Sequence, residues 1–360
     1  MKVFAAIMAG GVGARFWPQS RESMPKQFLK VFGDRTLFQR TFDRISTVIT
    51  PENIFVVTNT VQRPLAIAQL PQLPQRNIIA EPFGRNTAPC IAAAASSMSS
   101  ITEDAVMVVL PSDHLISEED KFIAQLKDAI RLADKQRALV TIGIRPTHPE
   151  TGFGYIHFDD SSVTKEVSDH GGRHVIAFKE KPDHEAAVKF LESGAYLWNS
   201  GMFVWRVDVI LEELRKNLTH FSDFWSQLRN SFGTPAFDKT LEEFYLRAQS
   251  ISVDYAVMEK AANVLTIPSS FTWSDVGSWD EVYRLSDRDG DGNSFKGDVV
   301  NIRSRNSLVW ADEKVFGLVD VDDLLVVETK DSVLICRRGK SQAVKEIVDI
   351  LKKKDRQDLI

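Results

Sequence analysis

Apolar and polar residues alternate in blocks along the first 145 residues, and these blocks predict strands and helices in turn. Short apolar runs typical of buried strands occupy residues 3–9, 53–59, 76–82, 105–111 and 138–144. Helices are predicted between them, at residues 37–49, 87–98 and 121–136. They are amphipathic, except for the second, which is rich in small residues. Alternating units with buried strands predict an α/β fold, in which a Rossmann-like, mostly parallel sheet is covered by helices on both faces.

The pattern becomes mixed between residues 150 and 285, with aromatic strands around Tyr155 and Phe203 and a helix at residues 207–218. Gly and Asp then cluster at residues 286–298. This break predicts a large domain before residue 286 and a small domain after it.

The small domain, residues 286–360, is predicted to be β-rich. Its apolar runs recur at a spacing of about ten residues, as expected for stacked β turns. A last helix at residues 340–354 has one apolar face, which we expect to pack against the tail or against a second subunit.

Composition narrows the classes of protein that the chain can be. The 360 residues, 43% of them apolar, suffice for a sizeable core. No apolar stretch is long enough for a membrane span and residues 1–20 lack a signal-peptide pattern, so we expect a cytoplasmic protein with no membrane partner. A net charge of −5 argues against a nucleic-acid partner. Cys90 and Cys336 lie too far apart in sequence to predict a disulfide framework or a zinc site.

A glycine-rich turn directly after the first predicted strand indicates a site for a nucleoside triphosphate. Residues 9–13 read AGGVG, and Arg15 and Lys26 follow. Backbone N–H groups at the end of a strand can bind a polyphosphate while basic side chains neutralise its oxygens. No Gly-Lys-Ser/Thr closes the turn, and Phe16 replaces the third glycine of the dinucleotide fingerprint. The glycines could instead be turn residues only.

Seven segments in order carry a resemblance to a known family. They are AGGVGARFWPQSRESMPKQFL from residue 9, EPFGRNTAP at 81–89, LPSDH at 110–114, GFGYI at 152–156, FKEKPD at 178–183, WNSGMF at 198–203 and WSDVGSW at 273–279. Together they resemble the nucleotide-diphospho-sugar pyrophosphorylases, in particular the mannose-1-phosphate guanylyltransferases. The resemblance implies a tail that forms a short left-handed β-helix. Longer members of the family add an isomerase domain, for which this chain has too few residues.

The resemblance implies a reaction and the residues that carry it. An oxygen of α-D-mannose 1-phosphate would attack the α-phosphorus of GTP, giving GDP-mannose and pyrophosphate. The nucleophile is already anionic, so alignment and charge neutralisation are needed rather than a general base. Asp113 and Asp275 match the family's Mg²⁺ ligands, and carboxylates suit this ion. Arg15 and Lys26 match positions that hold the triphosphate and the departing pyrophosphate.

The residues expected to bind the nucleotide are also implied by the resemblance. They are Ala9, Gly10, Gly11, Gly13, Glu81, Asn86, Thr87, Pro111 and Ser112. Guanine presents two adjacent donors, which one carboxylate can accept as a forked pair, so Glu81 favours guanine. The related thymidylyl- and uridylyltransferases resemble one another in carrying Gln near this place. A Glu that only caps a helix or lies at the surface is the alternative.

The residues expected to bind the sugar phosphate are Gly154, Glu180, Lys181, Asn199 and again Asp275, also by resemblance. Glu180 and Asn199 suit sugar hydroxyls, which donate and accept together, and Lys181 suits the phosphate. Phe153 stands where family members commonly have Tyr, so this chain lacks a hydroxyl there.

Two other functions stay open at this point. One is a nucleotidyltransferase that acts on a different sugar 1-phosphate, and the other is a nucleotide-sugar sensor without turnover. The presence of Asp113, Asp275 and Lys26 disfavours the sensor, since a site that only binds needs no pair of metal carboxylates. We also expect a homodimer formed through the C-terminal domain.

Overall fold

In the computed structural model, which describes residues 1–11, 13–161 and 163–360, the chain folds into two compact units. The first unit comprises residues 1–10, 41–112 and 116–273, and the second comprises residues 11–40, 113–115 and 274–360. The segment that follows the first two glycine-turn residues therefore folds together with the C-terminal tail.

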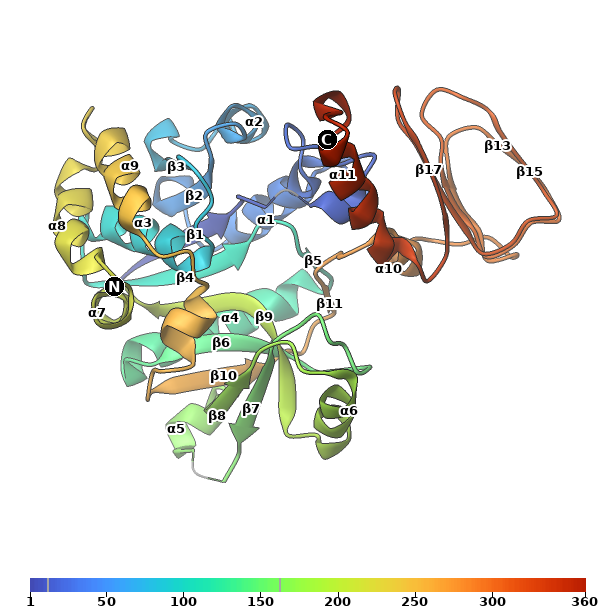
Figure 1. Ribbon diagram of the computed structural model, residues 1–360. Helices are drawn as coiled ribbons and strands as arrows, with labels where there is room; N and C mark the ends of the chain where they lie inside the picture. Colours follow the sequence, from blue (N-terminus) through green and yellow to red (C-terminus); the bar gives the residue numbers. More distant parts are fainter. Residues whose placement is uncertain (12, 162) are drawn as a thin grey trace. The chain divides into compact units, whose positions relative to one another are not determined.

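The first unit is built on a nine-stranded sheet with the strand order β3-β2-β1-β4-β9-β6-β10-β8-β7 (Figure 1). Its strands are β1 Lys2–Met8, β2 Ile54–Asn59, β3 Ile78–Glu81, β4 Ala105–Pro111, β6 Leu139–Ile144, β7 Tyr155–Asp159, β8 Arg173–Lys179, β9 Tyr196–Arg206 and β10 Val264–Pro268. Its helices are α2 Arg63–Gln69, α3 Thr87–Ser99, α4 Glu119–Gln136, α5 Lys165–Asp169, α6 His184–Ser193, α7 Val207–Asn217, α8 Phe221–Ser231 and α9 Phe237–Arg247. A five-residue π-helix, Asp254–Met258, precedes β10.

The α/β class is confirmed, but the sheet is mixed rather than mostly parallel, since four neighbouring strand pairs are parallel and four are antiparallel. The predicted phosphate-binding turn follows β1, in the parallel part. β3, β2, β1 and β4 are parallel neighbours, as are β6 and β10. β9 runs antiparallel between β4 and β6, and β7 and β8 form a further antiparallel pair. Hydrophobicity did not distinguish β9 from a parallel strand, because it is largely buried on both faces. The carboxyl ends of β1, β3 and β4 share one edge of the sheet, where ligands bind in such folds.

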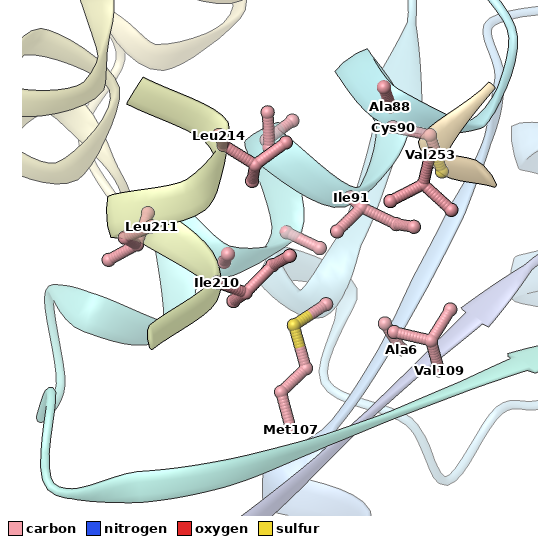
Figure 2. Close-up of a cluster of buried hydrophobic side chains, with 14 of the residues drawn as sticks. Ala6, Ala88, Cys90, Ile91, Met107, Val109, Ile210, Leu211, Leu214 and Val253 are labelled. Atoms are coloured by element: carbon pink, nitrogen blue, oxygen red, sulfur yellow. The ribbon is translucent and has the colours of Figure 1, made fainter. Parts of the chain in front are cut away.

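Small residues let α3 approach the sheet closely. Figure 2 shows Ile91 of α3 in a buried cluster with Met107 of β4 and with Ile210 and Leu214 of α7. α3 is almost fully buried and rich in alanine, as the sequence predicts for a helix packed closely on a sheet. Helix α4 contacts β4, β6 and β9. Its buried residues do not belong to the cluster that α3 and α7 form with the sheet, so α4 covers the opposite face.

The second unit contains the predicted β-rich tail. Its strands are β12 Ser294–Lys296, β13 Val299–Ile302, β14 Leu308–Trp310, β15 Phe316–Val319, β16 Leu324–Glu328 and β17 Val333–Arg337, and its helices are α10 Trp279–Leu285 and α11 Val344–Lys353. β12, β14 and β16 pair in parallel, as do β13 and β15, while β17 runs antiparallel to β16. Three further elements begin in one unit and end in the other: α1 Leu37–Ser46, β5 Leu115–Ile116 and β11 Trp273–Ser274.

Helix α11 packs against the tail, as expected, and also against the segment after the glycine turn. Val344 and Val348 share one buried cluster with Phe16, Trp17 and Leu325. Trp17 Nε1 also donates a hydrogen bond of 2.9 Å to the backbone oxygen of Leu359. The C-terminal residues thus stabilise the segment that follows the glycine turn. Among the described residues, no helix is long and apolar enough to span a bilayer.

A buried carboxylate fixes one corner of the tail. The side chain of Glu328 is 0% exposed and accepts hydrogen bonds from the backbone N–H groups of Asp312, Glu313 and Lys314 at 2.8, 3.3 and 3.2 Å. Lys314 Nζ adds an ion pair of 2.5 Å. The hydrogen bond from Lys314, supported by the backbone donors against the opposing effect of burial, lowers the pKa of Glu328 to about 2.

Because this pKa is depressed in the folded chain, Glu328 contributes stability above its ordinary pKa of 4.5 and loses that contribution as the pH falls toward about 2. Glu328→Gln should lower the melting temperature at pH 7 and weaken its dependence on pH below 4.5. Thermal unfolding measured from pH 7 downward tests this, with the exposed Glu313→Gln as the control. Equal melting curves for the two variants would contradict the prediction.

Candidate active site

The predicted site residues fall into two sets. Ala9, Gly10, Glu81, Asn86, Thr87, Pro111, Ser112, Gly154, Glu180, Lys181 and Asn199 belong to the first unit. Gly11, Gly13, Arg15, Lys26, Asp113 and Asp275 belong to the second unit. Each set is described below within its own unit, by the contacts of its side chains and backbone.

In the first unit, backbone hydrogen bonds hold the end of β1. Ala9 N–H donates to the oxygen of Val57 at 2.7 Å, and the oxygen of Ala9 accepts from Thr58 Oγ1 at 3.0 Å. Ser112, directly after β4, donates its N–H to the oxygen of Met8 at 3.0 Å. The ends of β1 and β4 are therefore tied together where a phosphate-bearing ligand was predicted.

Glu81 is the last residue of β3 and is only 6% exposed, so the surface-Glu alternative is wrong. Its Oε1 accepts a hydrogen bond of 2.7 Å from Tyr245 Oη on α9. Its Oε2 lies 2.9 Å from the position that a Cβ atom would take at Gly10, so a side chain at residue 10 would crowd this oxygen. Burial raises the pKa of Glu81 to about 7, and the Tyr245 hydrogen bond opposes this rise.

Asn86 and Thr87 begin α3. Asn86 adopts a left-handed φ of 66°, and its Oδ1 accepts from the N–H of Thr87 at 2.8 Å. Thr87 Oγ1 in turn accepts from the N–H of Val253 at 2.9 Å. Both side chains therefore shape the loop and the start of α3, and Thr87 connects them to the segment before the π-helix.

The predicted sugar-site residues come together around Gly154. The N–H of Asn199 donates to the oxygen of Gly154 at 2.8 Å, and Asn199 Nδ2 donates to Asp254 Oδ1 at 2.6 Å. A Cβ atom at residue 154 would displace the Glu180 carboxylate, since its Oε2 occupies that space. Lys181 Nζ lies 3.6 Å from Glu180 Oε1 and is mostly exposed, so its charge remains open to a ligand.

Two carboxylates near this position have raised pKa values. Burial raises the pKa of Asp254 despite the hydrogen bond from Asn199, and burial followed by the charge of Asp254 raises the pKa of Glu180. Carboxylate oxygens at such a pair can accept hydrogen bonds from hydroxyl groups. Asp254 is a site residue that sequence reasoning missed, although it begins a π-helix, an element frequent at functional sites.

Phe153 lacks the hydroxyl group that a Tyr would carry at this position, and its ring makes aromatic contacts. Its ring lies edge-on to those of Trp198 and Trp273, with centroids 5.2 and 5.4 Å away. Phe153 therefore makes aromatic contacts with two tryptophans rather than a polar contact.

In the second unit, Lys26 is the centre of the arrangement. It is 6% exposed, and its Nζ lies 2.8 Å from Asp113 Oδ2. The same ammonium donates to the backbone oxygens of Asp275 at 2.6 Å and Val276 at 3.1 Å. An ammonium has three N–H donors, so these three acceptors match it fully. Lys26 thereby joins the two segments that carry the predicted metal ligands.

The glycine turn approaches Lys26 closely. Gly13 has a φ of 65°, and a Cβ atom there would lie 2.8 Å from Lys26 Cβ, so both the conformation and the space require glycine. Gln27 Nε2 donates to the oxygen of Gly11 at 3.0 Å, whereas Arg15 is exposed. Arg15 therefore supplies a charge that a ligand can reach.

A strained turn presents Asp275. Val276 is fully buried with a φ of 47°, a conformation that costs a β-branched residue on the order of 1–3 kcal/mol. Its N–H donates to Ser274 Oγ at 3.0 Å, and Ser274 Oγ donates to Glu281 Oε1 at 2.6 Å. These bonds and the Lys26 contact hold the turn.

The electrostatic surroundings of Asp113 favour its ionised form. Burial alone would raise its pKa, but the charge of Lys26, with a smaller effect from His114, holds the pKa below its ordinary value. The result is a carboxylate of 34% exposure beside the Asp275 turn. These are hard oxygen donors of the type that Mg²⁺ binds.

Comparison with known proteins defines the class of this arrangement. A family model described as nucleotidyl transferase matches residues 4–292, and one described as MannoseP isomerase/GMP-like beta-helix domain matches residues 297–351. The first covers most of the chain and includes every predicted site residue, so the class is that of the nucleotidyltransferase enzymes.

The relatives are more specific. The chain is 42% identical over 356 residues to mannose-1-phosphate guanylyltransferase of Escherichia coli K12, covering 98% of this chain and 74% of the relative. It is 41% identical over 358 residues to the protein of that name from Klebsiella pneumoniae, again covering 98% and 74%. A Thermus thermophilus structure described as a mannose-1-phosphate geranyltransferase matches with a TM-score of 0.86 at 30% identity, covering 98% of this chain and 100% of that one. The chain belongs to the nucleotidyl transferase family, among the mannose-1-phosphate guanylyltransferases.

The Lys26 contacts predict a stability effect. Lys26→Met preserves length but leaves Asp113 and two carbonyl groups without the ammonium. We expect a loss of about 2–3 kcal/mol, less than for a fully buried pair because solvent reaches part of Asp113. Urea unfolding measures this, with the exposed Lys30→Met as the matched control. A Lys26→Met midpoint equal to that of the control would contradict the prediction.

Proposed function

We propose that the chain transfers GMP from GTP to α-D-mannose 1-phosphate, with release of pyrophosphate and formation of GDP-mannose. The observation that carries the proposal is the 42% identity, over nearly the whole chain, to a relative named for this activity. Each unit also holds residues suited to one part of the reaction.

The base is read by Glu81 in this proposal. In its ionised form the carboxylate accepts from the ring N–H and the exocyclic amine of guanine, donors that adenine and uracil do not present together. The raised pKa of Glu81 means that this form grows as the pH rises through about 7. GTP affinity should therefore increase over that range.

Asp113 and Asp275 would hold a Mg²⁺ ion. Among the described residues, no three His, Cys, Asp or Glu side chains form a metal-binding group. The pair still fits Mg²⁺, which is usually bound by one or two carboxylates together with substrate phosphates. When bound, the ion supplies charge neutralisation at the α-phosphate. Lys26 keeps both carboxylate segments in place, and Arg15 neutralises the departing pyrophosphate.

The sugar phosphate is held by residues of the first unit. The exposed ammonium of Lys181 attracts the phosphate, whereas Glu180 and Asp254 accept hydrogen bonds from sugar hydroxyls. Asn199 keeps Asp254 in place through its 2.6 Å hydrogen bond. The attacking phosphate oxygen needs no proton removed, so these groups orient the substrate rather than activate it.

We also propose a cytoplasmic homodimer that associates through the tail. Val300, Ile302 and Val319 are exposed on the paired strands β13 and β15, and the Ile302–Val319 register places all three on one face. Light scattering should give twice the chain mass, and Ile302→Lys should shift it toward the monomer. A monomeric parent chain would contradict the dimer.

The activity is tested by pyrophosphate release across GTP, ATP, UTP and dTTP, each with mannose 1-phosphate and with glucose 1-phosphate. The proposal requires the highest kcat/KM for GTP with mannose 1-phosphate, and formation of GDP-mannose in equal amount. Preference for another sugar phosphate would establish a different nucleotidyltransferase. Binding without turnover would establish the sensor.

Asp275→Asn tests the metal-binding pair. It preserves shape but removes one negative charge, so turnover should fall about 10²- to 10³-fold while the circular dichroism spectrum is unchanged. Asp287→Asn, at an exposed position in the same unit, is the control. A folded Asp275→Asn variant with the control's turnover would exclude Asp275 as a ligand.

A further inference from the structure

Tyr245 contacts three alternate residues of the EPFGR segment. Its Oη donates to Glu81 Oε1 at 2.7 Å, and its ring meets Phe83 edge-on with a centroid distance of 6.1 Å. Its backbone oxygen accepts from Arg85 Nε at 3.1 Å, and the Arg85 guanidinium lies 4.9 Å from the centre of the Phe83 ring. One fully buried residue thus contacts Glu81 and Phe83 through its side chain and Arg85 through its backbone oxygen.

The hydrogen bond from Tyr245 also distinguishes the two oxygens of Glu81. Oε1 is held from the α9 side, so rotation of the carboxylate is restricted. Oε2 lies on the side of Gly10, 2.9 Å from the position that a Cβ atom would take there. The carboxylate is therefore presented in one orientation, with its second oxygen toward the glycine turn.

We propose that Tyr245 is a positioning residue for base specificity, fixing the Glu81 carboxylate in the orientation that accepts the two guanine donors. This inference rests on the proposed function, in which Glu81 reads the base. Tyr245 acts through Glu81 and does not itself touch the nucleotide. A phenylalanine would retain the ring contacts but leave the carboxylate free to rotate.

Among the residues that the structure describes, two titratable groups interact with Glu81. Tyr245 approaches from α9, and the buried thiol of Cys90 lies on α3, where the charge of Glu81 adds to burial in raising the thiol's pKa. Burial also raises the pKa of Tyr245 far above its ordinary value, so its hydroxyl remains a donor at neutral pH.

The test compares GTP with ITP, because hypoxanthine retains the ring N–H of guanine but lacks the exocyclic amine. Tyr245→Phe should reduce the GTP-over-ITP ratio of kcat/KM about three- to tenfold, the effect of one hydrogen bond. The KM for mannose 1-phosphate should stay within about twofold of the parent value, because the loss concerns base binding only.

A pH profile gives a readout that a merely structural role would not change. Removing the Tyr245 hydroxyl removes a donor that favours the ionised carboxylate, so the pKa of Glu81 rises. The acid limb of the GTP KM profile should therefore move to higher pH in Tyr245→Phe. Tyr283→Phe is the matched control, since it removes a buried hydroxyl that donates to the oxygen of Gly292 in the second unit.

Glu81→Gln separates failure of this inference from failure of the proposed base reader. If Glu81→Gln leaves the GTP-over-ITP ratio unchanged, Glu81 does not read guanine and both fail. If Glu81→Gln lowers the ratio while Tyr245→Phe behaves like Tyr283→Phe, only the role of Tyr245 is overturned. Support requires that Tyr245→Phe lowers the ratio in the parent chain but not in a Glu81→Gln background.

Discussion

The second unit depends on one buried ammonium. Lys26 Nζ meets the Asp113 carboxylate and two carbonyl groups of the Asp275–Val276 turn, and so joins three segments that are far apart in the sequence. A lysine removed from water needs such a complete set of acceptors. The left-handed Val276 is tolerated because these contacts, together with those of Ser274 and Glu281, determine the turn. The two carboxylates of the proposed metal site thus owe their placement to a residue expected mainly to bind phosphate.

In the first unit, the segment from Tyr245 to Asp254 contacts both the residues proposed to bind the base and those proposed to bind the sugar. Tyr245 holds Glu81, Val253 donates to Thr87, and Asp254 accepts from Asn199. Both proposed subsites therefore share one support, built from α9 and the π-helix rather than from the sheet. This arrangement suits a reaction without a general base, in which the relative placement of two substrates contributes most of the rate.

The sequence predicted most strands and helices of the first 145 residues, because buried strands and amphipathic helices leave strong periodicities, but it missed the short helix α2. The candidate site residues came from contiguous motifs. It did not reveal the antiparallel β9, whose burial resembles that of a parallel strand. Tyr245 lies near Leu241 and Phe244 in a pattern typical of a helix that packs on a hydrophobic core. Asp254 belongs to none of the seven motifs. Contacts over such long separations leave no local signal, whereas Gly13 does, because its positive φ and its closeness to Lys26 both require glycine.

In the proposed reaction, a phosphate oxygen of mannose 1-phosphate forms the new bond to the α-phosphorus that comes from GTP. Mannose 1-phosphate carrying ¹⁸O in its non-bridging phosphate oxygens, followed by ³¹P NMR of the products, tests it. In this reaction the bond from the α-phosphorus to the pyrophosphate breaks and a bond to the labelled oxygen forms. The account predicts all of the label in GDP-mannose, including the oxygen between its two phosphorus atoms, and none in pyrophosphate. Label in the pyrophosphate, or an unlabelled bridging oxygen, would contradict it.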